Sequence, residues 1–242
     1  MLYIKKDLMP KKIQEQVIKI EKTEEWKGLN ENDTKGIRAC FDSLDKELIR
    51  TELVKEQHGL CAYCMRKIDD SSSTTIEHFR PIRNKLDALN YNNMLACCDG
   101  GRNSKGTKVL CCDASKGDQE ITFGPFDESF INSLRYTKDG YIYTCPKNAD
   151  AERDINDILR LNGIRDEKGC LKYDTATQLV AGRKHTYRNY SLIMEKLDKK
   201  AGGNQVKMAM SIRKLISQLE SQDTYQEYTG MLLYLLKNRL KR

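Results

Sequence analysis

The chain has 242 residues, of which 39% are apolar and 32% are charged, and its formal net charge at pH 7 is +7. This composition is typical of a globular protein with a core of its own and argues against a disordered chain. No apolar run approaches the ~18 residues that a membrane-spanning helix needs, since the longest is Met231–Leu236, and we predict no membrane association.

The N-terminal residues lack the apolar stretch and cleavage site of a secretory signal, so we expect a cytoplasmic protein whose thiols stay reduced. Positive charge gathers toward the C-terminus: residues 183–242 contain 13 Lys and Arg against 5 Asp and Glu, a difference of +8. Together with a sequence pI near 8.8, this balance favours a polyanionic partner such as nucleic acid.

The first 57 residues predict an N-terminal helical arm. Apolar residues recur at helical spacing after Pro10, which suits the start of a helix: Ile13, Val17 and Ile20. The polar segment 22–36 is expected to be a loop. A second helix is predicted to open near Asp33 or Thr34 and to run to about residue 54, because apolar residues recur along it at three- and four-residue steps: Ile37, Phe41, Leu44, Leu48 and Val54.

Residues 126–242 predict a hairpin followed by helices. The alternating residues on either side of Asp139-Gly140 are typical of a tight β-hairpin. Asn148 or Asp150 can cap a helix that runs to about Leu161. Apolar periodicity then predicts three further helices, over residues 175–200, 205–221 and 224–240. The whole chain is therefore predicted to be α+β and mostly helical.

Six of the nine cysteines lie close together in the chain, where clustered thiols of a reducing compartment more often bind metal than form disulfides. Cys61 and Cys64 have the C-x-x-C spacing that presents two sulfurs to one zinc ion, and tetrahedral zinc needs two more ligands. Adjacent side chains on an extended strand point in opposite directions, so one sulfur is expected from each of two doublets: Cys97-Cys98 and Cys111-Cys112. Zinc chemistry alone leaves open which member serves. The later doublets argue against the alternative, a thiol redox pair.

The segment IEHFRP (residues 76–81) lies between these sulfur pairs. His78 directly follows a carboxylate, Glu77, and an imidazole with a pKa near ~6.5 can accept a proton at neutral pH. An imidazole beside a hard oxygen ligand within a metal-binding frame indicates a catalytic role. The other two histidines, His58 and His185, have no such setting and are interpreted as structural or surface residues.

These motifs resemble the HNH endonucleases of the ββα-metal fold over roughly residues 50–125. The resemblance rests on C-x-x-C, then EH-x-x-P, then an asparagine before apolar residues and a cysteine, and finally a cysteine, an acid and Lys-Gly. It implies a zinc-stapled ββα core, placed at residues 58–125, whose zinc ligands are Cys61, Cys64, Cys98 and Cys112.

Carried over by position, the resemblance makes His78 the general base and Glu77 an acidic ligand of a catalytic ion. Phosphodiester hydrolysis needs an activated water and a cation that neutralises the phosphorane, and carboxylate oxygens suit Mg²⁺ or Mn²⁺. We therefore predict two metals with different tasks: a structural Zn²⁺ held by thiolates and a catalytic Mg²⁺ or Mn²⁺ held by Glu77 and a second acid.

The two remaining HNH positions are also assigned through the resemblance. The middle position, which steadies the hairpin and orients the general base, falls on Asn93, because many family members have a zinc-binding cysteine five residues later, here Cys98. The alternative register pairs Asn92 with Cys97. The third position, the second acidic ligand of the catalytic ion, falls on Asp113, directly after the last zinc cysteine. Asn103 competes with Asp113 for that place.

A glycine-rich basic insertion follows Cys98, where many HNH domains have a second C-x-x-C. In this the chain resembles the nuclease subunits of Septu-type anti-phage systems (PtuB-like), including those that accompany retrons. The resemblance implies a defence nuclease that acts on DNA, or on RNA such as tRNA. Its expected partners are an ABC-type ATPase subunit (PtuA-like) and a retron reverse transcriptase complex.

Basic side chains near the motifs are candidates for phosphate contacts: Arg80, Arg83, Arg102, Lys105, Lys108 and Lys116. The alternative function is a zinc-stapled module that binds nucleic acid without cutting it. Because such a module has no need of a base beside hard-metal ligands, the Glu77-His78 pair together with Asp113 favours a nuclease.

Overall fold

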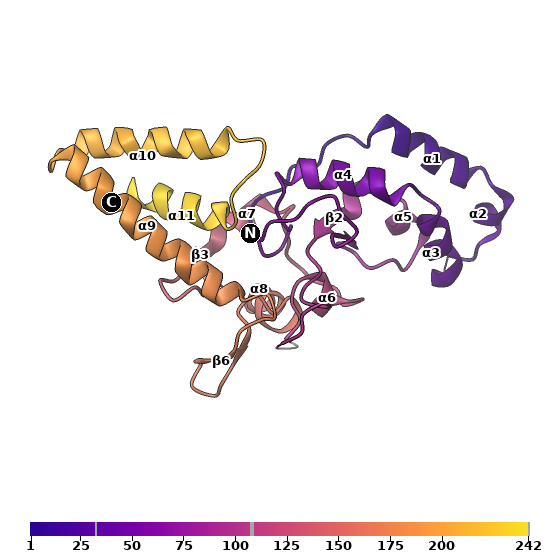
Figure 1. Cartoon of the computed structure of the whole chain (residues 1–242). Coiled ribbons are helices and arrows are strands. Elements are labelled where there is room, and N and C mark those ends of the chain that lie inside the picture. Colours follow the sequence, from indigo (N-terminus) through magenta and orange to yellow (C-terminus); the bar gives the residue numbers. More distant parts are fainter. Residues whose placement is uncertain (32, 107–108, 242) are drawn as a thin grey trace.

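The computed structural model describes residues 1–31, 33–106 and 109–241 (Figure 1). The fold is α+β and about 47% helical, as expected for the general class, and the described residues form three separate two-stranded antiparallel sheets. Figure 1 shows the N-terminal and the C-terminal helices at opposite ends of the molecule, with the short central strands between them.

The described part of the N-terminal arm contains four helices: α1 (Lys11–Glu21), α2 (Glu24–Gly28), α3 (Thr34–Asp42) and α4 (Lys46–Glu56). The prediction of α1 is confirmed, and its Ile13 is buried. The expected loop is wrong, because Thr23 caps α2 and Trp26 buries its side chain. The single helix expected to residue 54 is also wrong: the Asp45 carboxylate accepts a hydrogen bond from the Leu48 N–H and starts α4 as a new helix.

The centre of the molecule is a short antiparallel sheet with small helical elements around it: β1 (Thr75–His78), α5 (Lys85–Ala88), the 3₁₀ turn η1 (Tyr91–Asn93), β2 (Met94–Cys97) and α6 (Asp113–Lys116). In the sheet Thr75 lies opposite Cys97, and His78 lies opposite Met94. Every residue of β2 is buried, and α4 packs against both strands. The sheet therefore lies in the core, and His78 is at the end of its first strand.

The next part of the chain forms two hairpins and a helical segment: α7 (Glu128–Ser133), β3 (Leu134–Tyr136), β4 (Ile142–Thr144), α8 (Ala149–Arg153), the π-helical turn η2 (Asp154–Ile158), β5 (Ile164–Arg165) and β6 (Leu171–Tyr173). The predicted hairpin is confirmed as β3–β4, and Gly140 has a positive φ in its turn. Asn148 caps α8, but the helical segment ends at η2, before Leu161. The sequence does not predict β5–β6, whose strands are exposed and have only two and three residues.

Three helices complete the described chain: α9 (Leu179–Ala201), α10 (Gln205–Glu220) and α11 (Thr229–Arg239). The prediction of α10 holds to within one residue. α9 begins later than expected, because the Asp174 carboxylate and the Thr175 hydroxyl accept hydrogen bonds from its first N–H groups. The three helices pack around an apolar cluster of their own, which includes Met208, Ile212, Leu219, Leu233 and Leu236. Among the described residues, no helix is both long and apolar enough to cross a membrane.

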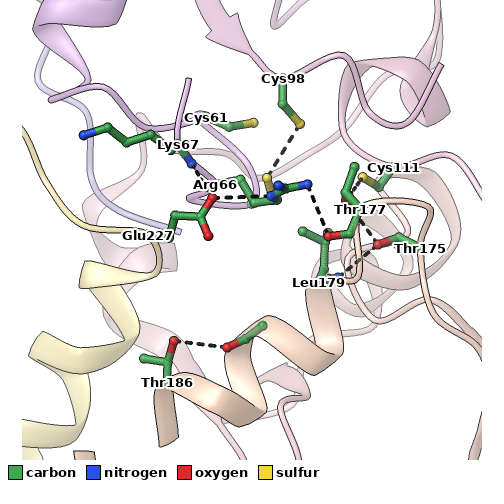
Figure 2. A network of polar contacts seen from close by, with 12 residues as sticks. Cys61, Arg66, Lys67, Cys98, Cys111, Thr175, Thr177, Leu179, Thr186 and Glu227 are labelled. Carbon is green, nitrogen blue, oxygen red and sulfur yellow. Dashed lines mark hydrogen bonds and ion pairs between the residues drawn. The ribbon is translucent and has the colours of Figure 1, made fainter. Parts of the chain in front are cut away.

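Polar contacts tie the cysteine-rich segment to these C-terminal helices (Figure 2). Glu227, just before α11, accepts a hydrogen bond from the Lys67 N–H at 3.0 Å and lies 3.5 Å from the Arg66 guanidinium. The same guanidinium donates to the Thr177 carbonyl, just before α9, at 3.3 Å. The turn that carries the first two cysteines is therefore attached to the start of both helices.

The C-terminal charge excess is not wholly on the surface. Arg183 of α9 is buried and donates hydrogen bonds to the backbone carbonyls of Gly140 and Leu161, both at 2.6 Å. It fastens α9 to the turn of the β3–β4 hairpin. The exposed positive charge of this helix comes from other residues, such as Lys184 and Arg188.

Candidate metal centre and adjoining cleft

Four cysteine side chains form a buried quartet: the sulfurs of Cys61, Cys64, Cys98 and Cys112 all lie within 4.8 Å of one another. The Cys61 and Cys112 sulfurs are 3.9 Å apart, and the Cys64 and Cys98 sulfurs are 3.8 Å apart. Four thiolates bound about 2.3 Å from one tetrahedral zinc ion lie about 3.8 Å from each other, so the observed spacing fits. The predicted quartet is thus positioned to hold a metal ion, and its donor set is compatible with structural Zn²⁺.

Tight turns bring these sulfurs together. The Cys61 N–H donates to the Arg66 carbonyl at 2.8 Å, and the Met65 N–H donates back to the Cys61 carbonyl at 3.0 Å, which closes the C-x-x-C turn. The expectation that each doublet supplies one sulfur is confirmed. Its assumption of an extended strand is wrong for the second doublet, because Cys112 has a φ of +55° and directly precedes α6.

The other thiol of each doublet has different neighbours. Cys97 ends β2 and is fully buried, and burial raises the pKa of its thiol well above the usual value. It therefore behaves as a small apolar side chain. The Cys111 sulfur lies 3.3 Å from the Thr177 hydroxyl oxygen, so it faces the start of α9 (Figure 2).

A cleft of about 730 Å³ adjoins the quartet on the side where α6 begins. His78 and Glu77 line it from β1, and Asp113 lines it from the first turn of α6. Asn103, the competitor of Asp113, is an exposed residue of the insertion and is not among the residues that line the cleft. The structure therefore brings His78, Glu77 and Asp113 together and leaves Asn103 outside.

The His78 ring is held in one orientation. Its Nε2 lies 3.0 Å from the Ala88 carbonyl, and because a carbonyl can only accept, Nε2 carries the proton and Nδ1 carries the lone pair. Phe41 of α3 packs edge-on against the ring, with centroids 4.6 Å apart. His78 is 7% exposed, and burial lowers its pKa to about 4. The imidazole is therefore neutral at neutral pH.

Glu77 and Asp113 form a carboxyl pair next to one buried cation. The Lys116 ammonium lies 2.8 Å from a Glu77 carboxylate oxygen, to which the Tyr63 hydroxyl donates at 3.1 Å. Burial and the Asp113 carboxyl raise the pKa of Glu77 to about 8. Burial opposes ionisation of Asp113 too, but hydrogen bonds from Glu77 and Arg102 hold its pKa below the usual value. At neutral pH, one proton is therefore shared at this pair.

Asn93 clamps the loop that follows β1. Its side-chain oxygen accepts a hydrogen bond from the Arg80 N–H at 2.8 Å, and its amide nitrogen donates to the carbonyls of Arg80 at 2.9 Å and Asp87 at 3.0 Å. Asn93 is buried, whereas Asn92, the other register, is exposed. The loop-steadying contacts expected of the middle motif position are therefore made by Asn93.

Lys116 corrects one assignment made from the sequence. It was expected at a nucleic-acid surface, but its side chain is 1% exposed and cannot reach a phosphate in bulk solvent from this position. Besides its contact with the Glu77 carboxyl group, it donates to the His78 carbonyl at 3.1 Å. Lys116 therefore supports the end of β1 from inside the protein.

The other expected phosphate contacts lie on the surface. Three arginines are exposed and have acidic neighbours: Arg80 lies 3.4 Å from Asp87, Arg83 lies 2.8 Å from Glu120, and Arg102 lies 2.9 Å from Asp113. Lys105 is exposed on the insertion, and Lys108 is outside the described residues. A guanidinium has five N–H donors, so an arginine with one acidic neighbour can still contact a phosphate.

The remaining histidines fit the interpretation given to them. His58 stacks on Tyr225 with ring centroids 4.1 Å apart, and its Nδ1 lies 3.1 Å from the Asp223 carbonyl oxygen. His185 is exposed on α9. Neither lines the cleft.

Sequence reasoning missed two residues of the site. Arg38 of α3 lines the cleft, but nothing in the chain marks it, because only folding brings α3 next to β1 and α6. Tyr63 lies inside the C-x-x-C motif, whose spacing points to the sulfurs and not to the residues between them. Its full burial and its contact with Glu77 become visible only in the structure.

No protein-family model matches the chain, and no curated protein is significantly similar to it. The geometry and chemistry of the site are therefore the basis for a functional assignment.

Proposed function

We propose that this chain is a metal-dependent endonuclease of the HNH type. The observation that carries the proposal is the convergence of His78, Glu77 and Asp113 in one cleft beside a four-cysteine quartet. An imidazole with a free lone pair, two carboxyl groups and a separate thiolate site together match what phosphodiester hydrolysis requires, and a simple zinc-binding module would not need the first two.

The order of the elements supports the same proposal. The antiparallel pair β1–β2 is followed in the chain by α6, and residues in or next to each of these elements lie at the site. His78 ends β1, Asn93 directly precedes β2, and Asp113 is the first residue of α6. We take β1, β2 and α6 as the ββα core of the resemblance, with the cysteine quartet holding the helix against the strands.

The carboxyl pair is a suitable site for a catalytic divalent cation. Glu77 and Asp113 offer hard oxygen ligands, which Mg²⁺ and Mn²⁺ prefer, whereas the quartet offers thiolates, which select zinc. A cation there would neutralise charge that develops on the phosphate. Because Glu77 holds a proton at neutral pH in the cation-free site, cation binding would be coupled to release of that proton.

His78 would act as the general base. Its Nδ1 lone pair can accept a proton from an attacking water, while the Nε2–H bond to the Ala88 carbonyl fixes the tautomer. Asn93 holds the loop that carries this carbonyl, so it is a positioning residue. Arg38 and Arg102 at the cleft place positive charge where the nucleic-acid strand would enter.

Substrate and partners follow only from the resemblance and remain part of the proposal. The substrate class is DNA or RNA such as tRNA, and the expected partner is an ABC-type ATPase of a Septu-type or retron-associated defence complex. The exposed arginines and the net charge of +7 support a polyanionic substrate.

The proposal is tested by incubating zinc-loaded protein, alone and with any ABC-type ATPase encoded beside it, with plasmid DNA and with total RNA. Cleavage is expected only when Mg²⁺ or Mn²⁺ is added, and Glu77→Gln and Asp113→Asn should abolish it while zinc content stays at one per chain. Nucleic-acid binding without any cleavage, under every metal condition, would favour the alternative of a binding module.

A further inference from the structure

Leu86 is one of the two most exposed large apolar residues in the described chain. Its side chain is 84% exposed, and only Leu8, at 94%, exceeds it. A single exposed leucine needs no special explanation on a protein surface. The position of Leu86 sets it apart, because it lies in the loop that joins His78 to Asn93 and borders the cleft through Pro81 and Ile82.

The backbone that presents Leu86 is firmly held. Leu86 lies within α5, which begins where the Asn84 side chain accepts a hydrogen bond from the Asp87 N–H at 3.0 Å. The Asp87 carbonyl accepts from Asn93, and the Ala88 carbonyl accepts from His78. The two residues that follow Leu86 are thus bonded directly to the site, so Leu86 has a fixed position relative to the His78 ring.

The charge around Leu86 favours an anionic partner. Arg80, Arg83 and Lys85 lie in the same loop, and the first two are exposed. Two carboxylates partly balance them, Asp87 near Arg80 and Glu120 near Arg83. An apolar side chain among cations on a rigid loop suits a surface where bases and phosphates lie side by side.

We propose that Leu86 is a wedge that inserts between two neighbouring bases of the bound nucleic acid and thereby sets which phosphate lies at His78. The proposal rests on the proposed nuclease function and adds a positioning residue to it. Apolar wedges of this kind partly unstack a base step, at a cost of a few kcal/mol, and fix the local path of the strand. Since α5 is bonded to His78 and Asn93, the distance between Leu86 and the His78 imidazole would be constant.

Cleavage by Leu86 variants is the first test. Leu86→Ala removes most of the apolar side chain, and we expect the cleavage rate to fall about tenfold or more, since burial of a leucine is worth that much or more in an equilibrium. Leu86→Met, which keeps apolar length, should restore most of the rate. The matched control is Leu8→Ala, another exposed leucine outside the cleft, which should cleave like the wild type.

Base unstacking is the second test, and it does not depend on cleavage. His78→Ala protein is mixed with a short DNA duplex and with an RNA hairpin of the same stem sequence, each labelled with 2-aminopurine, whose fluorescence rises when it is unstacked. We expect the rise with at least one of the two nucleic acids, and its loss when Leu86→Ala is added.

The outcomes separate the two proposals. If the wild type cleaves and Leu86→Ala cleaves equally well with an unchanged fluorescence rise, the wedge is wrong and the nuclease stands. The same result would be expected if Leu86 served to dock another protein. If the protein never cleaves nucleic acid but unstacks it in a way that Leu86→Ala abolishes, the nuclease is wrong, and Leu86 is a base wedge without a role in placing a phosphate at His78. Binding with no Leu86-dependent fluorescence overturns the wedge for both nucleic acids.

Discussion

The cysteine-rich centre, residues 60–117, and the C-terminal helices α9 to α11 are stabilised in different ways. In the centre β1, β2, α5 and α6 have four residues each, and such short elements are not stable alone. The C-terminal helices have 23, 16 and 11 residues and bury an apolar cluster of their own. The centre shares the main apolar cluster of the protein and adds to it a quartet positioned to hold a metal ion and buried polar contacts, whereas the C-terminal helices depend on apolar packing.

This difference suits a division of labour. A catalytic site needs polar and charged groups in fixed positions, and these groups cannot contribute the apolar burial that stabilises helices. In the centre the cysteine quartet and the Lys116, Tyr63 and Asn93 contacts hold Glu77 and His78 in place. The following variants separate the two regions, in order of decreasing expected effect.

The largest effect is expected from Cys112→Ser, which removes one ligand of the quartet. Structural zinc contributes on the order of 10 kcal/mol to small zinc modules, against a total stability of about 5–15 kcal/mol for a domain. Bound zinc, measured by mass spectrometry of the metal, should be lost together with the folded centre. Cys111→Ser is the matched control and should keep one zinc per chain. The reverse result would exchange the roles of the two cysteines.

A smaller effect, about 4 kcal/mol, is expected from Lys116→Met. This variant removes the buried ammonium beside Glu77 and leaves only the partly exposed Arg102 next to the Glu77–Asp113 pair, and removing one partner of a buried charged contact is costly. Urea unfolding measures the loss, and zinc content should stay unchanged. Lys105→Met, at an exposed lysine of the neighbouring insertion, should change the free energy of unfolding by less than about 0.5 kcal/mol. Equal effects of the two variants would contradict the buried role of Lys116.

The helical region is tested by Ile212→Ala, which opens a cavity in the cluster of α9 to α11. Ile212 is buried, and the expected loss is about 3 kcal/mol. Hydrogen exchange should quicken in these helices, while β1, β2 and the zinc content are unaffected. Met210→Ala, on the exposed side of α10, should have little effect. Loss of zinc from Ile212→Ala would show that the two regions unfold together.

The smallest effect on stability, about 2 kcal/mol, is expected from Asn93→Ala, which removes three hydrogen bonds within the site. Its effect on cleavage should be larger than its effect on stability, because the loop that orients His78 is released. Asn92→Ala is the control, since Asn92 is exposed. If the cleavage rate of Asn93→Ala falls only as much as its loss of folded protein explains, Asn93 has no positioning role.

The sequence predicts the apolar parts of the fold well. α1, α10 and the β3–β4 hairpin follow from helical spacing and turn residues, which are local signals. The division between α3 and α4 depends on one capping carboxylate, Asp45, that competes with a continuing apolar pattern. The strands of the β5–β6 hairpin are exposed and have only two and three residues, so their sequence is too short to predict a strand from apolar alternation.

The site is predictable only in part. Spacing predicts that each cysteine doublet supplies one sulfur, whereas the choice of Cys98 and Cys112 and the pairing of His78 with Asp113 come from the resemblance to HNH endonucleases. Lys116 could not be placed correctly, because spacing gives its position on α6 but not that it points into the core. Arg38 could not be found at all, since α3 reaches the cleft only through tertiary packing.

The most direct test of the central claim, that this cleft hydrolyses phosphodiester bonds with His78 as the base, is the cleavage rate of zinc-loaded His78→Ala in Mg²⁺ or Mn²⁺. We predict a rate lower than that of the wild type by a factor of about 10² to 10⁴, the usual contribution of a general base, with an unchanged zinc content. A variant that cleaves at the wild-type rate with its zinc in place would contradict this account.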